Sequence, residues 1–133
     1  MAQAVNGPLH GSKCRDEWVA RVNALVNGVE EWACAQDWAV ARSGNEIHER
    51  SSGEYTVPLL RVRLAEGEIH VFSVGRDVMG AEGRVDIEAF LALSRVRLVY
   101  RDRQWQIITD SNVPLRQPWN AETFAQLARD LVA

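Results

Sequence analysis

The stretch 59-LLRVRLAEGEIHVFSV-74 decides the fold, because it has the pattern of two half-buried strands joined by a short turn. Apolar and polar residues alternate on both sides of Glu66-Gly67, which predicts an antiparallel hairpin with strands over residues 59–65 and 68–74. Pairing outward from a two-residue turn gives Leu64 with Ile69, Val62 with Val71, Arg63 with His70, and Arg61 with Phe72. The first two pairs form an aliphatic face and the others a polar face. A slip by one residue would bury the arginines, so the pattern predicts one buried and one exposed face.

A second hairpin follows from the same pattern nearer the C-terminus. Alternation predicts strands over residues 95–101 and 104–109, which meet at Asp102-Arg103. The expected pairs are Tyr100 with Trp105, Leu98 with Ile107, and Val96 with Thr109. The turn contains no glycine, which leaves a longer or bulged loop open as an alternative to a tight turn.

A long helix is expected before the hairpins. Residues 1–11 contain two glycines and a proline, and are expected to form a loosely ordered lead-in. Large apolar residues then recur at alternating spacings of four and three over Trp18–Trp32. This periodicity predicts an amphipathic helix over about residues 13–36.

A shorter helix is expected at the C-terminus. Asn120 is a favourable N-cap, and Trp119 and Phe124 have the spacing of a hydrophobic staple across it. Behind the cap, apolar residues at helical spacing predict a buried stripe. This stripe consists of Phe124, Leu127, Ala128 and Leu131.

The segment between the long helix and the first hairpin allows two interpretations. Trp38–Arg42 either extends the helix or begins a strand, and Ser43–Asn45 is expected to form a turn in both cases. Short strands are expected over residues 46–49, at an edge, and 84–88. The prediction is a single α+β domain over residues 1–133, with a long N-terminal helix, an antiparallel sheet of about five strands and a C-terminal helix.

Composition limits the classes of protein to consider. A chain of 133 residues that is 47% hydrophobic and 25% charged has the profile of a globular domain. No apolar run approaches the roughly 20 residues of a membrane span, so no membrane association is expected. Cys14 and Cys34 are too few for a disulfide framework, and the N-terminus lacks the pattern of a secretion signal. These features predict a soluble protein of the reducing cytoplasm.

The densest polar cluster, 75-GRDVMGAEGRVDIE-88, is the first candidate site. Its charged residues are Arg76, Asp77, Arg84, Asp86 and Glu88, and three glycines punctuate it. Carboxylates on one face of a strand could bind a divalent cation or share acid–base chemistry, with the arginines orienting an anionic substrate. The alternative is an irregular connection whose arginines and acids neutralise one another.

A second candidate site is the polar face of the two hairpins. It would carry Arg61, Arg63, Arg95, Arg97, Arg101 and Arg103, with His70 and Phe72 between them. Such a face could bind an anionic partner, and Arg63 and His70 are the candidate ligand-binding residues on it. The formal net charge of −3 argues against nucleic acid and favours an ordinary solvated face.

The function expected from these features is a small cytoplasmic binding or protein-interaction module without cofactor or metal. No nucleophile motif or phosphate-binding glycine loop is present, and a lysine suited to a metal-dependent nuclease core is absent, since the only lysine is Lys13. The expected partner is a protein or a small anionic ligand, and the broad apolar stripe favours a homodimer. The alternative is a small metal-dependent hydrolase that acts through Asp77, Asp86 and Glu88, with Arg76 and Arg84 orienting an anionic substrate.

Overall fold

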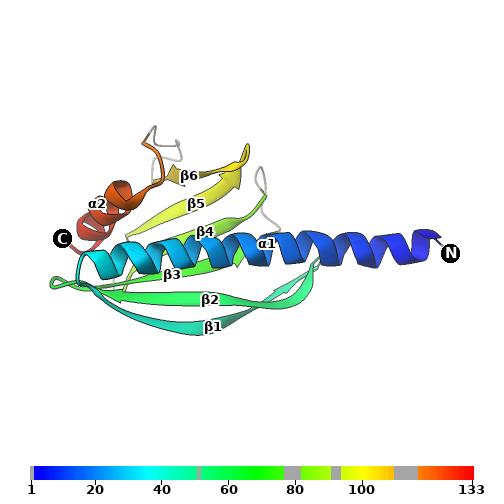
Figure 1. Ribbon diagram of the computed structural model, residues 1–133, viewed down its shortest axis with the longest axis horizontal. Coiled ribbons are helices and arrows are strands. Elements are labelled where there is room, and N and C mark those ends of the chain that lie inside the picture. Colours follow the sequence, from blue (N-terminus) through cyan, green and yellow to red (C-terminus); the bar gives the residue numbers. More distant parts are fainter. Residues whose placement is uncertain (1, 51, 77–81, 91–93, 110–116) are drawn as a thin grey trace.

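The computed structural model describes residues 2–50, 52–76, 82–90, 94–109 and 117–133, with side chains from Cys14 onward. In chain order its elements are α1 (Ala2–Ala35), β1 (Ala39–Glu49), β2 (Gly53–Arg63), β3 (Glu68–Gly75), β4 (Arg84–Ala89), β5 (Arg95–Arg101), β6 (Gln104–Ile108) and α2 (Ala121–Val132). Within these described ranges the six strands form one antiparallel sheet in the order of the sequence. Figure 1 shows α1 lying across this sheet and α2 beside it near one end. The predicted α+β class is confirmed, with six strands in place of about five.

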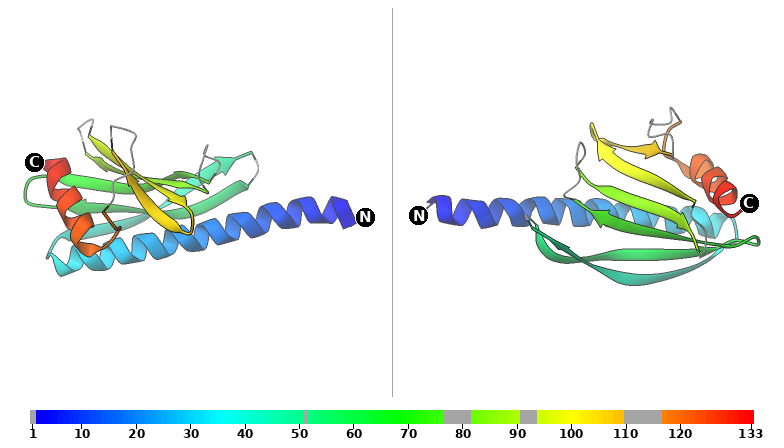
Figure 2. Two further views of the ribbon diagram at one scale, coloured as in Figure 1. Left: turned by 90° about the horizontal axis from the view of Figure 1, so that it is seen from above. Right: turned by 180° about the vertical axis from the view of Figure 1, so that it is seen from behind.

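Both helices lie against the same face of the sheet, and the core lies between the helices and this face (Figure 2). The aliphatic residues that were predicted to turn inward are fully buried: Val62, Val71, Leu98 and Ile107. The helices contribute further fully buried side chains, among them Trp18, Val22 and Phe124. Burial of aliphatic surface on both sides of this interface is the main favourable contribution to the stability of the fold.

The first hairpin has the predicted faces but a different register. The observed pairs are Leu60 with Val71, Arg61 with His70, Val62 with Ile69, and Arg63 with Glu68. Each residue is therefore displaced by two positions from its predicted partner, and the backbone N–H of Leu64 donates to the carbonyl of Gly67 at 2.8 Å to close a four-residue connection. A displacement by two residues keeps every side chain on the same face, so the hydrophobic pattern cannot distinguish the two registers.

The second hairpin has the predicted register along most of its length. Tyr100 pairs with Trp105 and Leu98 with Ile107, although the predicted pair of Val96 with Thr109 is wrong because β6 ends at Ile108. Asp102 and Arg103 have φ values of 54° and 63°. Two successive left-handed residues are the geometry of a tight type I′ turn, which forms here without glycine.

Two segments differ from the prediction. Helix α1 begins at Ala2 rather than at residue 13, so the lead-in expected over residues 1–11 is helical from Ala2. Each residue added to an existing helix gains one backbone hydrogen bond, and the helix extends past the end of the sheet (Figure 1).

The prediction of a turn at Ser43–Asn45 is wrong, because β1 continues through these residues and each of them pairs with β2. Ladder partners on a neighbouring strand override local turn preferences.

Helix α2 begins as predicted. The side chain of Asn120 accepts a hydrogen bond from the backbone N–H of Thr123 at 2.9 Å, which caps the helix. The rings of Trp119 and Phe124 meet edge to face with centroids 5.9 Å apart, as the hydrophobic staple requires. Trp32 of α1 contacts both rings, so the cap also fixes α2 against α1.

We predict that Gly83→Ala destabilises the fold by about 2 kcal/mol or more, because the core has no room for a methyl group there. A Cβ on Gly83 would lie 2.3 Å from the ring of the buried Trp18. The backbone cannot move aside easily, since the carbonyl of Gly83 accepts a hydrogen bond from the N–H of Tyr100 at 3.0 Å. Urea unfolding followed by tryptophan fluorescence measures the change.

Gly28→Ala is the matched control for this substitution. A Cβ there would meet only Trp32, at an ordinary 3.9 Å, inside α1. Alanine is the better helix former by about 1 kcal/mol, so this variant should be more stable than the native protein. A Gly83→Ala variant as stable as the native protein would contradict the packing described above.

Candidate functional site

The polar side chains of the hairpins gather on the face of the sheet opposite the two helices. None of the described helices covers this face, which is turned to the viewer in the right panel of Figure 2. Its central part holds five arginines and three carboxylates, together with a histidine and a phenylalanine. These are Arg61, Arg63, Arg84, Arg95, Arg97, Glu68, Asp86, Glu88, His70 and Phe72. The structure therefore brings residues of both sequence-predicted sites onto one surface.

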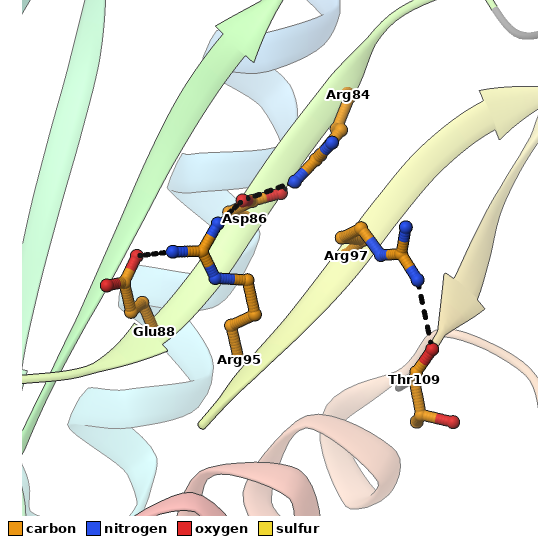
Figure 3. A network of polar contacts seen from close by, with 6 residues as sticks. All are labelled: Arg84, Asp86, Glu88, Arg95, Arg97 and Thr109. Carbon is orange, nitrogen blue, oxygen red and sulfur yellow. Dashed lines mark hydrogen bonds and ion pairs between the residues drawn. The ribbon is translucent and has the colours of Figure 1, made fainter. Parts of the chain in front are cut away.

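Asp86 is at the centre of this surface and is only 1% exposed. Its two carboxylate oxygens accept hydrogen bonds from Arg84 Nε at 2.7 Å and Arg84 Nη2 at 2.8 Å, a bidentate pair (Figure 3). Arg95 Nη1 approaches the same carboxylate at 3.4 Å. The hydrogen bonds to Asp86 raise the pKa of Arg84 above its ordinary value, so the guanidinium stays charged.

The network continues from Asp86 along the neighbouring strands. Arg95 Nη2 also pairs with Glu88 at 3.3 Å, and Arg97 Nη2 donates to the carbonyl of Thr109 at 3.1 Å (Figure 3). These contacts join β4 to β5 and β5 to the end of β6. These contacts hold the strands together on the outer face of the sheet.

The structure describes two of the three acidic residues predicted as the catalytic cluster. Asp86 and Glu88 share one face as expected, but both oxygens of Asp86 already bind arginine. Asp77 lies outside the described residues. Among the residues that are described, no group of three histidine, cysteine or acidic side chains is placed to hold a metal ion.

Arg76 belongs to a different group of residues, at the far end of the sheet. Its backbone N–H donates to Glu49 Oε1 at 2.9 Å, and its Nη1 donates to Ser52 Oγ at 3.1 Å. The hydroxyl of Tyr55 also donates to Glu49. Burial, followed by the neighbouring carboxylate, raises the pKa of Tyr55 well above its ordinary value. The group ties the turn between β1 and β2 to the end of β3, and no local motif in the sequence marks it.

A shallow hollow of about 210 Å³ lies on the outer face near β1. Arg61 and Arg63 line it from β2, two residues apart on one strand, and therefore point to the same side. The small side chains of Ala39 and Ala41, directly across the strand pair, leave the space between and beside them open. The Arg63 side chain is 75% exposed.

Glu68 also lines the hollow, and the rings of His70 and Phe90 lie farther along the outer face, on β3 and directly after β4. His70, which pairs with Arg61, stacks on Phe90 with centroids 5.2 Å apart, and Phe90 is 54% exposed. His70 Nε2 lies 2.7 Å from Glu68 Oε2, and Arg63 Nη2 lies 3.4 Å from Glu68 Oε1. The hydrogen bond with His70 and, to a smaller extent, that from Arg63 lower the pKa of Glu68. We call Arg61, Arg63, His70 and Phe90 the basic patch.

Comparison with known proteins adds no relative: no protein-family model, no curated protein and no solved structure matches this chain. None of the described helices has both the length and the apolar character needed to cross a membrane. The chemistry of the surface is therefore the only basis for a function.

We predict that Asp86→Ala lowers the free energy of unfolding by about 3 kcal/mol, the lower end of the range for breaking a buried ion pair. The substitution leaves Arg84 and Arg95 beside one another without the carboxylate between them. Chemical unfolding at neutral pH gives the value. Glu88→Ala, on the same strand face but 30% exposed, is the control and should cost about 1 kcal/mol or less. Equal losses for the two variants would show that Asp86 is not the centre of the network.

Proposed function

We propose that this protein is a non-enzymatic interaction module that binds an acidic segment of a partner protein at the basic patch. The observation that carries the proposal is the hollow beside Arg61 and Arg63, two exposed arginines that share one side of a strand. Arg61 pairs with His70, which in turn stacks on the exposed ring of Phe90. Arg84 is held by the buried Asp86, whereas Arg61 and Arg63 are exposed and Arg63 makes one 3.4 Å contact with Glu68. Carboxylates are the natural counterparts of such a pair.

The weakness of single surface contacts favours a peptide segment over a small anion. An exposed ion pair contributes at most about 1 kcal/mol, so one carboxylate in this shallow hollow would bind poorly. A segment with several acidic residues can reach Arg61 and Arg63 together and place an apolar side chain against Phe90. Exposed aromatic residues beside charged ones are typical anchors of protein interfaces.

The overall charge of the chain favours a short acidic segment over nucleic acid as the ligand of the basic patch. The chain carries a formal net charge of −3, which repels a long polyanion outside the patch. A short segment contacts the patch alone and avoids most of that repulsion. We place the module in the cytoplasm as part of the same proposal, because two cysteines are too few for a disulfide framework.

We predict that a fluorescein-labelled octaglutamate peptide binds the native protein and that Arg61→Glu/Arg63→Glu weakens this binding at least tenfold. Reversing both charges replaces two attractions by two repulsions at the hollow. Fluorescence polarisation at low salt measures the affinity, which should also fall as ionic strength rises. Arg15→Glu, the same charge reversal on α1, is the control and should bind like the native protein.

Two results would contradict this function. One is equal binding of the peptide by the native protein and the double variant. The other is tighter binding of a single-stranded oligonucleotide of matched charge than of the peptide, which would make the patch a nucleic-acid surface. Circular dichroism of each variant shows whether a loss of binding comes from a loss of fold.

A further inference from the structure

Strand β1 is one edge of the sheet and is largely exposed. It pairs with β2 on one side, and Figure 1 shows no described element along its other side. Seven of its eleven residues are exposed, and the backbone hydrogen bonds of residues 39–48 that the structure shows all belong to the ladder with β2. An edge strand of this length is a template for another strand, and natural proteins protect such edges or use them.

The two halves of β1 turn different residues toward the core. In the first half Val40 pairs with the buried Val62, so the even-numbered residues face the helices. In the second half Ile47 pairs with the buried Tyr55, so the odd-numbered residues face them. In a continuous sheet, two residues that pair must point to the same side. Because the inward-facing residues change between the halves of β1, the axis of a symmetric pairing must lie within one half.

The second half of β1 complements itself when it is placed antiparallel to a copy of itself. With the twofold axis at Ile47, the two Ile47 side chains meet on the helix side of the sheet. Each Glu46 lies directly opposite His48 of the second copy, on the outer face, and Asn45 lies opposite Glu49. An apolar pair is therefore flanked by two pairs of acid with histidine, which are favourable cross-strand neighbours.

We propose that a second copy of this chain pairs with β1 along its free edge, in the antiparallel register centred on Ile47. The two six-stranded sheets then form one continuous sheet across the twofold axis. Each copy contributes the same surface, as a closed symmetric dimer requires. This inference is independent of the basic patch, because the residues at the new contact are Glu46, Ile47, His48 and the backbone beside them.

The contacts that His48 makes within its own chain are compatible with this pairing. Its Nδ1 lies 3.2 Å from Glu54 Oε1 of β2, and the two side chains are 63% and 80% exposed. Since Nδ1 faces Glu54, Nε2 is left for Glu46 of the second copy. The Cβ atoms of residues directly opposite each other are about 5 Å apart, which lets that carboxylate reach the ring.

A substitution that changes the charge on β1 tests the proposal. The native protein should have twice the monomer mass by sedimentation equilibrium. His48→Glu should be a folded monomer at the same concentration, because two carboxylates then face each other on both sides of the axis. Gln104→Glu adds the same charge at β6, the other edge of the sheet, and should remain a dimer. A monomeric native protein, or a dimeric His48→Glu variant, overturns the proposal.

A second substitution tests the register. Glu46→Arg combined with His48→Glu places a cation opposite each new carboxylate of the second copy, so this double variant should regain the dimer mass. If either variant fails to fold by circular dichroism, amide hydrogen exchange of the native protein replaces it. Amides of residues 45–49 should gain protection as concentration rises, and those of β6 should not. Unchanged exchange at 45–49, or a folded double variant that stays monomeric, overturns the proposal.

Discussion

Burial of one aliphatic sheet face beneath α1 and α2 is the constraint on which the rest of the structure depends. Side chains on a strand alternate between faces, so burying Val62 and Ile87 on one side requires that Arg61 and Asp86 lie on the other. The arginines thus collect on the outer face as a consequence of the core. Asp86 and Glu88 pair with Arg84 and Arg95, whereas Arg61 and Arg63 of the basic patch are exposed and lie farther from Asp86.

Sequence periodicity predicted the fold class, both hairpins, the capping of α2 and the buried face, because each follows from contacts between residues close in sequence. It did not predict the register of the first hairpin. Leu60 and Leu64 are equally suited to face a partner on β3, and only the closure of the connection between Leu64 and Gly67 decides between them. Nor did it predict β1 as one continuous strand, because its Ser43–Asn45 segment is extended only where β2 pairs with it.

The candidate site was also predicted only in part, because its contacts join residues that are far apart in the sequence. Alternation on β4 correctly placed Arg84, Asp86 and Glu88 on one face. Proximity in sequence did not reveal that Arg76 contacts Glu49 and Ser52, at the end of β1 and in the turn after it. Whether a carboxylate is open to a ligand depends on neighbours across the sheet. Both oxygens of Asp86 accept hydrogen bonds from Arg84, a contact that alternation along the strand does not predict.

The two proposals have a geometric consequence when they are taken together. Ala39 and Ala41, which line the hollow, belong to the strand that would pair with a second copy, but to its other half. They lie roughly 20–27 Å along the strand from an axis at Ile47, so pairing there leaves the hollow open. A dimer through β1 would carry two basic patches on the outer face of one continuous sheet, roughly 40–50 Å apart along the strands. An acidic segment of about 15 extended residues could reach both patches, and its avidity would exceed the affinity of either patch alone.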